Sequence, residues 1–155
     1  MPDNKKTNII DLVMTKEEFL KDDSKIILIL PGTIRSKKNS RQKHYAKTKT
    51  GKLIQFSAAS DSYRAWEQRA RQATQDQMNI SGIIYPMICK FKLEVKAFMA
   101  GNLMDLDAVH TAVMDALEGI VWKNDKQVAQ FSDQSCVVKE KVYPRTEVII
   151  EKLED

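Results

Sequence analysis

The segment Met87–Met99 constrains the fold more than any other part of the sequence, because apolar and charged residues alternate along it. One set of alternate positions holds Met87, Cys89, Phe91, Leu93, Val95, Ala97 and Met99, and the other holds Lys90, Lys92, Glu94 and Lys96. Successive side chains of a β-strand point to opposite faces, so the pattern predicts a strand with one buried and one wet face. Such a strand is typical of an antiparallel or mixed sheet, and Cys89 belongs to its buried face.

Two amphipathic helices flank this strand along the chain. The first follows Ser57, and its apolar stripe is formed by Ala59, Tyr63, Trp66, Ala70 and Ala73. Intervals of three and four residues indicate core packing there, rather than a platform on which bases stack. The second helix has Val109, Val113, Ala116, Leu117 and Ile120 on its apolar side, with Gly119 near its end.

Shorter elements complete the predicted domain. Strands are expected at 25–30, 128–131, 135–143 and 146–150, and a hairpin pairs 44–47 with 52–56 across 48–51. We therefore expect one α+β domain over residues 25–155, with a mixed or antiparallel sheet packed by two main helices. Residues 1–24 are expected to be an N-terminal extension with a short helix, because Thr15–Glu18 has the pattern of a capping box.

Composition excludes several classes of protein. The longest apolar run, Ile26–Leu30, is only five residues, which excludes a transmembrane helix and a signal-peptide core, so we expect a cytoplasmic protein with no membrane partner. The two cysteines, Cys89 and Cys136, indicate neither a disulfide framework nor a zinc site.

Positive charge is concentrated in one segment of the chain. Residues 26–60 contain eight Lys and Arg residues and no acidic residue, whereas the remaining 17 basic and 21 acidic residues give a net charge of −4. Clustered cations indicate a polyanion partner, because neutralising phosphates releases counterions; the alternative is a solvated basic loop. The residues that we expect to contact DNA are Arg35, Lys37, Lys38, Asn39, Arg41 and Lys43.

Three aspartates are candidates for a metal site. Asp105 and Asp107 lie two residues apart after the long strand, so in extended chain both carboxylates would point the same way. Asp125 follows the second helix. Carboxylate oxygens completed by water and phosphate hold Mg²⁺ at phosphate-processing sites. Taken singly, Asp105 or Asp107 is a good helix N-cap, and Asp125 is a good turn former. His44 and His110 are expected at the surface rather than as metal ligands.

The run from Asp105 to Val128 resembles the RusA family of Holliday junction resolvases, often carried by phages and prophages. The resemblance includes the Asp-Leu-Asp start, the Asp115-Ala116-Leu117 helix, the Gly-Ile-Val-Trp turn and the segment Asp125-Lys126-Gln127-Val128. It extends over about residues 25–151, through Pro31-Gly32, Lys38-Asn39-Ser40, Tyr63-Arg64-Ala65-Trp66 and Pro144-Arg145-Thr146-Glu147-Val148.

This resemblance implies a homodimer that cuts two strands of a four-way DNA junction by paired phosphodiester hydrolysis, in recombination and repair. Asp105, Asp107 and Asp125 would then be the catalytic carboxylates that bind Mg²⁺, with Mn²⁺ as an alternative. The chain departs from the family pattern at Ala108 (Asn in the family), Thr111 (Lys) and Asn124 (Asp). Loss of the lysine leaves a second interpretation open, a branched-DNA-binding protein of the same fold with weakened or lost cleavage.

Overall fold

The structure, a computed structural model, describes residues 25–36 and 41–153, with the backbone alone described for 41–44 and 56–59. The expected N-terminal extension and its helix at Thr15 therefore lie outside the described residues, as do Lys37, Lys38 and Asn39. The elements in chain order are β1 (Lys25–Pro31), β2 (Arg41–Lys47), β3 (Leu53–Ala59), α2 (Asp61–Ser81), β4 (Phe91–Met99), α3 (Leu106–Leu117), the 3-10 helix η2 (Asp125–Gln127), β5 (Val128–Phe131), β6 (Cys136–Lys139) and β7 (Arg145–Lys152).

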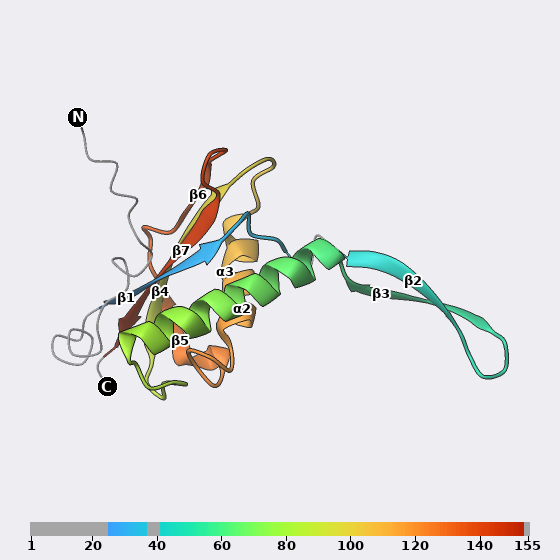
Figure 1. Cartoon of the computed structure of the whole chain (residues 1–155), viewed down its shortest axis with the longest axis horizontal. Coiled ribbons are helices and arrows are strands. Elements are labelled where there is room, and N and C mark those ends of the chain that lie inside the picture. Colours follow the sequence, from blue (N-terminus) through green and yellow to red (C-terminus); the bar gives the residue numbers. More distant parts are fainter. Residues whose placement is uncertain (1–24, 37–40, 154–155) are drawn as a thin grey trace.

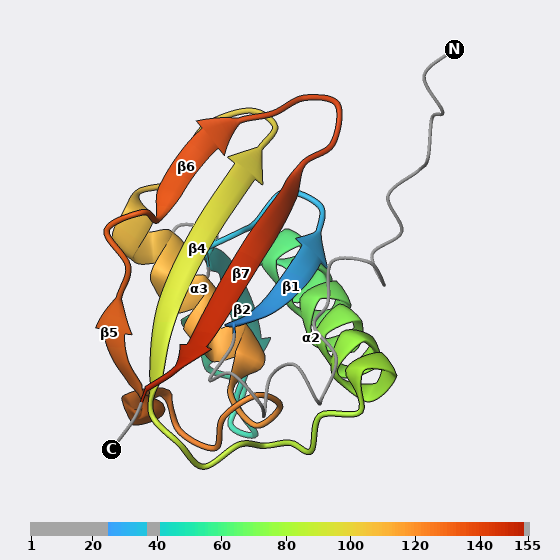
Figure 2. The same cartoon turned by 90° about the vertical axis from the view of Figure 1, so that its left-hand side faces the viewer.

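Five strands form one mixed sheet, which confirms the predicted α+β class. The strand order is β1-β7-β4-β5, and β6 pairs with the later part of β4. β7 is antiparallel to both β1 and β4, whereas β5 and β6 are parallel to β4. Figure 2 shows both helices, α2 and α3, behind the same face of this sheet.

The alternating segment forms the central strand, as its pattern predicted. Residues of β4 alternate between buried and partly exposed from Phe91 to Met99. The strand is shorter than expected, because residues 87–90 join no ladder: the backbone N–H of Met87 donates to the carbonyl of Val121 at 2.8 Å. Cys89 is only partly buried against the core.

Helix α2 begins later than the sequence indicated. Its N-cap is Ser60, whose Oγ accepts from the backbone N–H of Tyr63 at 3.2 Å, so Ser57 and Ala59 belong to β3 instead. A hydroxyl at the N-cap satisfies one of the free N–H groups of the first turn, which explains the choice of start. Tyr63 and Trp66 are buried in the core, as predicted for the aromatic stripe.

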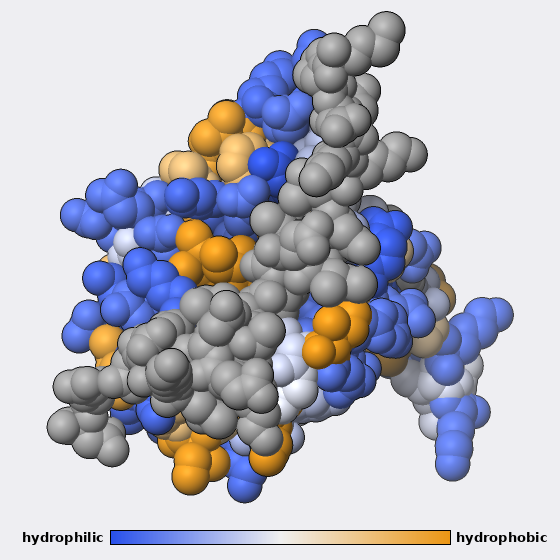
Figure 3. Space-filling view, turned by 60° about the vertical axis from the view of Figure 1, so that its left-hand side comes forward, coloured by the Kyte–Doolittle hydropathy of each residue, from blue (hydrophilic) through white to orange (hydrophobic). Residues whose placement is uncertain are grey.

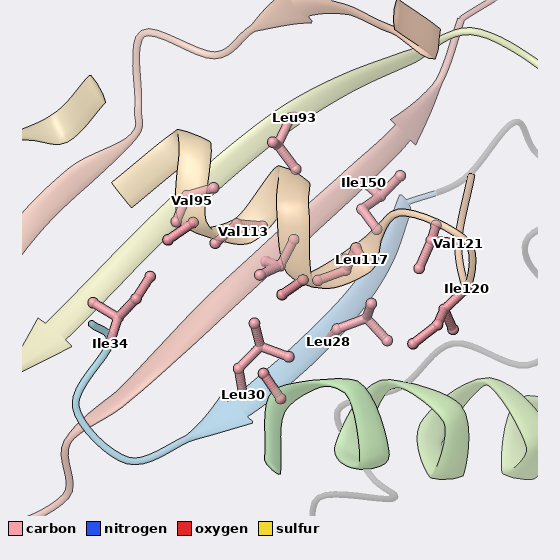
Figure 4. Close-up of a cluster of buried hydrophobic side chains, with 14 of the residues drawn as sticks. Leu28, Leu30, Ile34, Leu93, Val95, Val113, Leu117, Ile120, Val121 and Ile150 are labelled. Atoms are coloured by element: carbon pink, nitrogen blue, oxygen red, sulfur yellow. The ribbon is translucent and has the colours of Figure 1, made fainter. Parts of the chain in front are cut away.

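The core lies between the sheet and the two helices. Figure 4 shows side chains from β1, β4, β7, α3 and the loop after α3 meeting in one cluster. Fully buried members include Leu28, Leu93, Val113, Leu117 and Ile150. Ile120 is buried as predicted, although α3 ends at Leu117.

Strands β2 and β3 form a separate two-stranded sheet, which confirms the predicted hairpin and lengthens it. Arg41 pairs with Ala59 at the base, and Lys47 pairs with Leu53 next to the turn. Figure 1 shows that these strands project beyond the end of α2, away from the main sheet. Residues 41–59 are called the ribbon below.

The other face of the main sheet carries ion pairs. Arg145 lies 3.0 Å from Glu147, and Lys25 lies 3.9 Å from Glu151. Figure 3 shows mostly hydrophilic residues on this side, with hydrophobic ones in separate patches. In the part of the chain that is described, neither helix is long and apolar enough to cross a membrane. Neither Cys89 nor Cys136 is part of a disulfide.

Candidate functional site

Asp105 and Asp107 lie at the N-terminus of α3, immediately after the loop that follows β4. Asp105 is the N-cap residue and Asp107 is in the first turn, and both are exposed. The expectation that they share one side of an extended chain is wrong, because Leu106 already begins the helix. The partial positive charge of a helix N-terminus nevertheless favours both carboxylates here.

The side chain of Asp105 does not cap α3. Its backbone carbonyl accepts from the N–H of Val109 at 3.1 Å, but its carboxylate makes no capping hydrogen bond. An aspartate at this position ordinarily accepts from an N–H of the first turn. The capping explanation for Asp105 therefore does not account for its carboxylate, which is free to meet a ligand.

Asp125 lies in a well-ordered turn at the start of η2. Asn124 caps this turn and forms a capping box with Gln127. Gln127 also donates from Nε2 to the carbonyls of Met87 and Cys89, at 2.8 and 3.0 Å, which attaches η2 to the segment just before β4. Asn124 is one of the departures from the family pattern, and its side chain stabilises this turn by accepting from the backbone N–H of Lys126.

One chain does not bring the three aspartates together. Among the residues that are described, no three His, Cys, Asp or Glu side chains form a group that could hold a metal ion. Asp105 follows the end of β4, whereas η2 is attached before its beginning. Helix α3 has 12 residues, so its two ends are separated by about 18 Å.

A mainly apolar cavity of about 360 Å³ adjoins Asp107. It is lined by Leu106, Asp107, His110, Thr111, Met114 and Phe131, residues of α3 and the end of β5. Leu106 is 39% and Phe131 51% exposed, so two large apolar side chains face solvent beside Asp107. Sequence reasoning missed this surface; the available signal was the position of Leu106 between Asp105 and Asp107.

His110 is buried, contrary to the expectation of a surface residue. Its Nδ1 lies 3.0 Å from the carbonyl oxygen of Leu106, which can only accept, so Nδ1 carries the proton. Its Nε2 then accepts from Oγ of Ser135 at 3.3 Å, and its ring lies 4.5 Å from that of Phe131. Burial lowers the pKa of His110 below its usual 6.5, opposed by its bond to the Leu106 carbonyl and by the charge of Asp107.

The cavity beside Asp107 has no Lys or Arg in its lining. Thr111, which stands where the family has a lysine, is exposed and donates from Oγ1 to the carbonyl of Asp107 at 2.9 Å. A threonine hydroxyl cannot supply the positive charge that would stabilise a phosphate in reaction.

The ribbon presents positive charge at its far end. Lys47, Lys49 and Lys52, called the tip lysines below, are all exposed. Arg35 is exposed just before the ribbon, and Arg41 and Lys43 are positions of β2. Residues 41–59 contain no Asp or Glu, so no acidic residue of the ribbon itself neutralises these cations.

Comparison with protein families identifies a match over most of the chain. A family model described as Endodeoxyribonuclease RusA matches residues 31–151. The match begins at the last residue of β1 and ends one residue before the end of β7. No curated protein sequence matches the chain.

Proposed function

This chain belongs to the RusA family of endodeoxyribonucleases, and from that membership we propose that it resolves four-way (Holliday) DNA junctions by metal-dependent phosphodiester hydrolysis. The cofactor would be Mg²⁺, with Mn²⁺ as an alternative, and the cellular setting DNA recombination and repair. The observation that supports this most directly is the pair of exposed carboxylates, Asp105 and Asp107, at the N-terminus of α3. Asp105 occupies the N-cap position, but its carboxylate makes no capping hydrogen bond.

The donor set fits a hard divalent cation. Asp105 and Asp107 offer carboxylate oxygens, which Mg²⁺ binds together with water and phosphate. When bound there, the cation would supply an activated water and charge stabilisation on the departing oxygen. The N–H groups of the first turn of α3 would favour a phosphate at the same place, because they are the positive end of the helix.

A homodimer would add the third carboxylate. Asp107 and Asp125 lie near opposite ends of α3, so a second copy related by a two-fold axis across this helix would bring its Asp125 to the first copy's Asp107. Such an interface is self-complementary, and most soluble homo-oligomers are of this symmetric kind. The apolar cavity between Leu106, Met114 and Phe131 would lie near the middle of the contact, where interfaces are most hydrophobic.

DNA would be held by the basic segment. We assign contacts with the sugar–phosphate backbone of the DNA to the residues expected from the sequence: Arg35, Lys37, Lys38, Asn39, Arg41 and Lys43. Arg35 is exposed, and Arg41 and Lys43 belong to the ribbon. Separation of this cationic segment from the aspartates lets one part of the protein bind phosphates while the other holds the cation.

Cleavage of a synthetic four-way junction, compared with linear duplex and with and without Mg²⁺, tests the proposed activity. Asp105→Asn and Asp107→Asn should each abolish cleavage while junction binding survives, because one negative charge is lost and the shape is kept. Asp76→Asn, the same change on the exposed side of α2, is the control and should cleave normally. Mg²⁺-dependent cleavage that persists in both α3 variants would overturn the proposed site.

Mixing two inactive variants tests whether the site is shared between copies. In a mixed dimer of Asp107→Asn with Asp125→Asn, a shared site leaves one centre with all three aspartates and the other with two substitutions. With random pairing, about a quarter of the sites would then be active, and junctions would be nicked in one strand. A site contained in one chain predicts no recovery, because each centre keeps one substitution.

A second candidate function is binding of branched DNA without efficient cleavage. The absence of Lys and Arg from the lining of the cavity beside Asp107 favours it. Thr111→Lys would restore a cation one turn after Asp107, on the same side of α3. A large gain in cleavage at unchanged junction affinity would support this candidate, whereas brisk cleavage by the unaltered protein would exclude it.

A further inference from the structure

The far half of the ribbon exposes large apolar side chains as well as lysines. Tyr45 is 63%, Leu53 61% and Ile54 43% exposed. A two-stranded hairpin is marginally stable alone, and apolar side chains are normally used to attach it to a core. In the ribbon these side chains remain on a projecting element instead, which Figure 1 shows extending away from the main sheet.

The strand register separates these residues onto two faces. Tyr45 pairs with Gln55 and Lys47 pairs with Leu53, so these four residues share one face. Leu53 is the diagonal neighbour of Tyr45, at a spacing that long and aromatic side chains bridge. Ile54 pairs with Ala46 and lies on the opposite face. One face therefore combines an aromatic ring, an aliphatic side chain and a cation.

The turn next to this face is held by several hydrogen bonds. The N–H of Gly51 donates to the carbonyl of Thr48 at 2.9 Å, and the N–H of Thr48 donates to the carbonyl of Lys52 at 2.8 Å. Gly51 has a φ of +84°, a conformation that favours glycine. Oγ1 of Thr48 also accepts from the N–H of Lys52 at 3.1 Å. The face is thus presented by a defined turn.

The charge around this face fits a nucleic acid as its partner. The tip lysines are exposed beside Tyr45 and Leu53, and the ribbon contains no acidic residue. An aromatic side chain flanked by cations matches a single-stranded or unstacked nucleotide, because the ring stacks on the base while lysines meet phosphates. In an intact duplex the faces of the bases are covered by their neighbours. They become accessible where stacking is interrupted.

We propose that the face formed by Tyr45, Lys47 and Leu53 stacks on bases exposed at the branch point of DNA, and that this contact makes the protein prefer branched over linear DNA. The proposal rests on the proposed function and adds to it a determinant of substrate choice. Insertion of an apolar or aromatic side chain at an interrupted base step is a general way for proteins to recognise distorted DNA. The tip lysines would hold the adjoining phosphates.

Equilibrium binding in the presence of EDTA, where no cleavage occurs, tests the proposal with Tyr45→Thr. Threonine keeps strand propensity, so the ribbon is retained while the ring is lost. Affinity for a four-way junction should fall by roughly 5- to 160-fold, the range for one lost aromatic–base stack. Affinity for a linear duplex of the same arm sequence should stay within about twofold, as for an exposed substitution. With 2-aminopurine at the branch point, the fluorescence change on binding should disappear.

Two further variants make the outcome decisive. Ile54→Thr makes a similar change on the opposite face and should leave both affinities within about twofold. Tyr45→Trp keeps an aromatic ring and should keep the preference for the junction. Equal loss on junction and duplex, no loss on either, or the same selective loss in Ile54→Thr would overturn the proposal. If the unaltered protein cleaves junctions and Tyr45→Thr still binds them in preference to duplex, the stacking proposal alone fails. If the unaltered protein shows no preference for junctions, the proposed function fails as well.

Discussion

Gln77 completes the edge of the main sheet, and its replacement should be among the most destabilising single changes in this chain. Among the strands that the structure describes, β1 pairs with β7 alone, on one of its two sides. On its other side, Oε1 of Gln77 accepts from the N–H of Ile29 at 2.9 Å, and Nε2 donates to the carbonyl of Ile29 at 2.8 Å. The side chain of Gln77 is 3% exposed, so water cannot replace it.

Gln77→Met removes both bonds and keeps the length of the side chain. It leaves one buried N–H and one buried carbonyl without partners, and each such group costs about 1–3 kcal/mol. We expect the free energy of unfolding to fall by about 2–6 kcal/mol. For a domain of this size, a loss near 4 kcal/mol lowers the melting temperature by about 8–16 °C.

Urea unfolding followed by tryptophan fluorescence measures this change directly, because Trp66 and Trp122 are both fully buried. Gln75→Met is the matched control, since Gln75 is exposed on the same helix and its replacement should change stability by no more than about 0.5 kcal/mol. A loss in Gln77→Met no larger than in this control would refute the reasoning, and would mean that the sheet edge rearranges to satisfy Ile29.

Three further predictions concern Arg71, His110 and the tip lysines. Arg71 donates from Nη1 to the carbonyls of Ala116 and Glu118, both at 2.9 Å. Arg71→Met should therefore lower the free energy of unfolding, measured in urea, by about 1.5–3 kcal/mol. A loss of stability no greater than in the exposed Arg64→Met would contradict this. Burial lowers the pKa of His110, so below pH 6.5 the unfolded chain binds a proton that the folded one does not. Stability should therefore fall as the pH drops from 6.5 toward the folded pKa, and His110→Gln should reduce that slope; an unchanged slope would exclude His110 as its source. Replacing the tip lysines with Gln should lower the slope of log affinity for duplex DNA against log salt by about 0.9 for each lysine that contacts phosphate, and an unchanged slope would remove them from the interface.

Local pattern was sufficient for the elements and their class. The alternation along β4 and the spacing of Tyr63, Trp66 and Ala70 report which side of an element is buried, because side-chain direction repeats with a period of two or 3.6 residues. The hairpin was likewise predicted from a short turn between two strand-forming stretches. Element ends were less accurate, because Ser57 and Ser60 are both suitable caps and their order along the chain cannot choose between them.

What tertiary structure alone decided concerns residues far apart in the sequence. The spacing of Asp105 and Asp107 makes them candidates for a shared site. Nothing local shows that Asp125 lies at the other end of α3, because that depends on the attachment of Gln127 to the segment before β4. The burial of His110 and the bond between Gln77 and Ile29 are of the same kind. A sequence pattern indicates which face of a helix or strand a residue occupies. Contacts between distant segments depend instead on how the helices and strands pack. These contacts decide which of the candidate residues can lie close together.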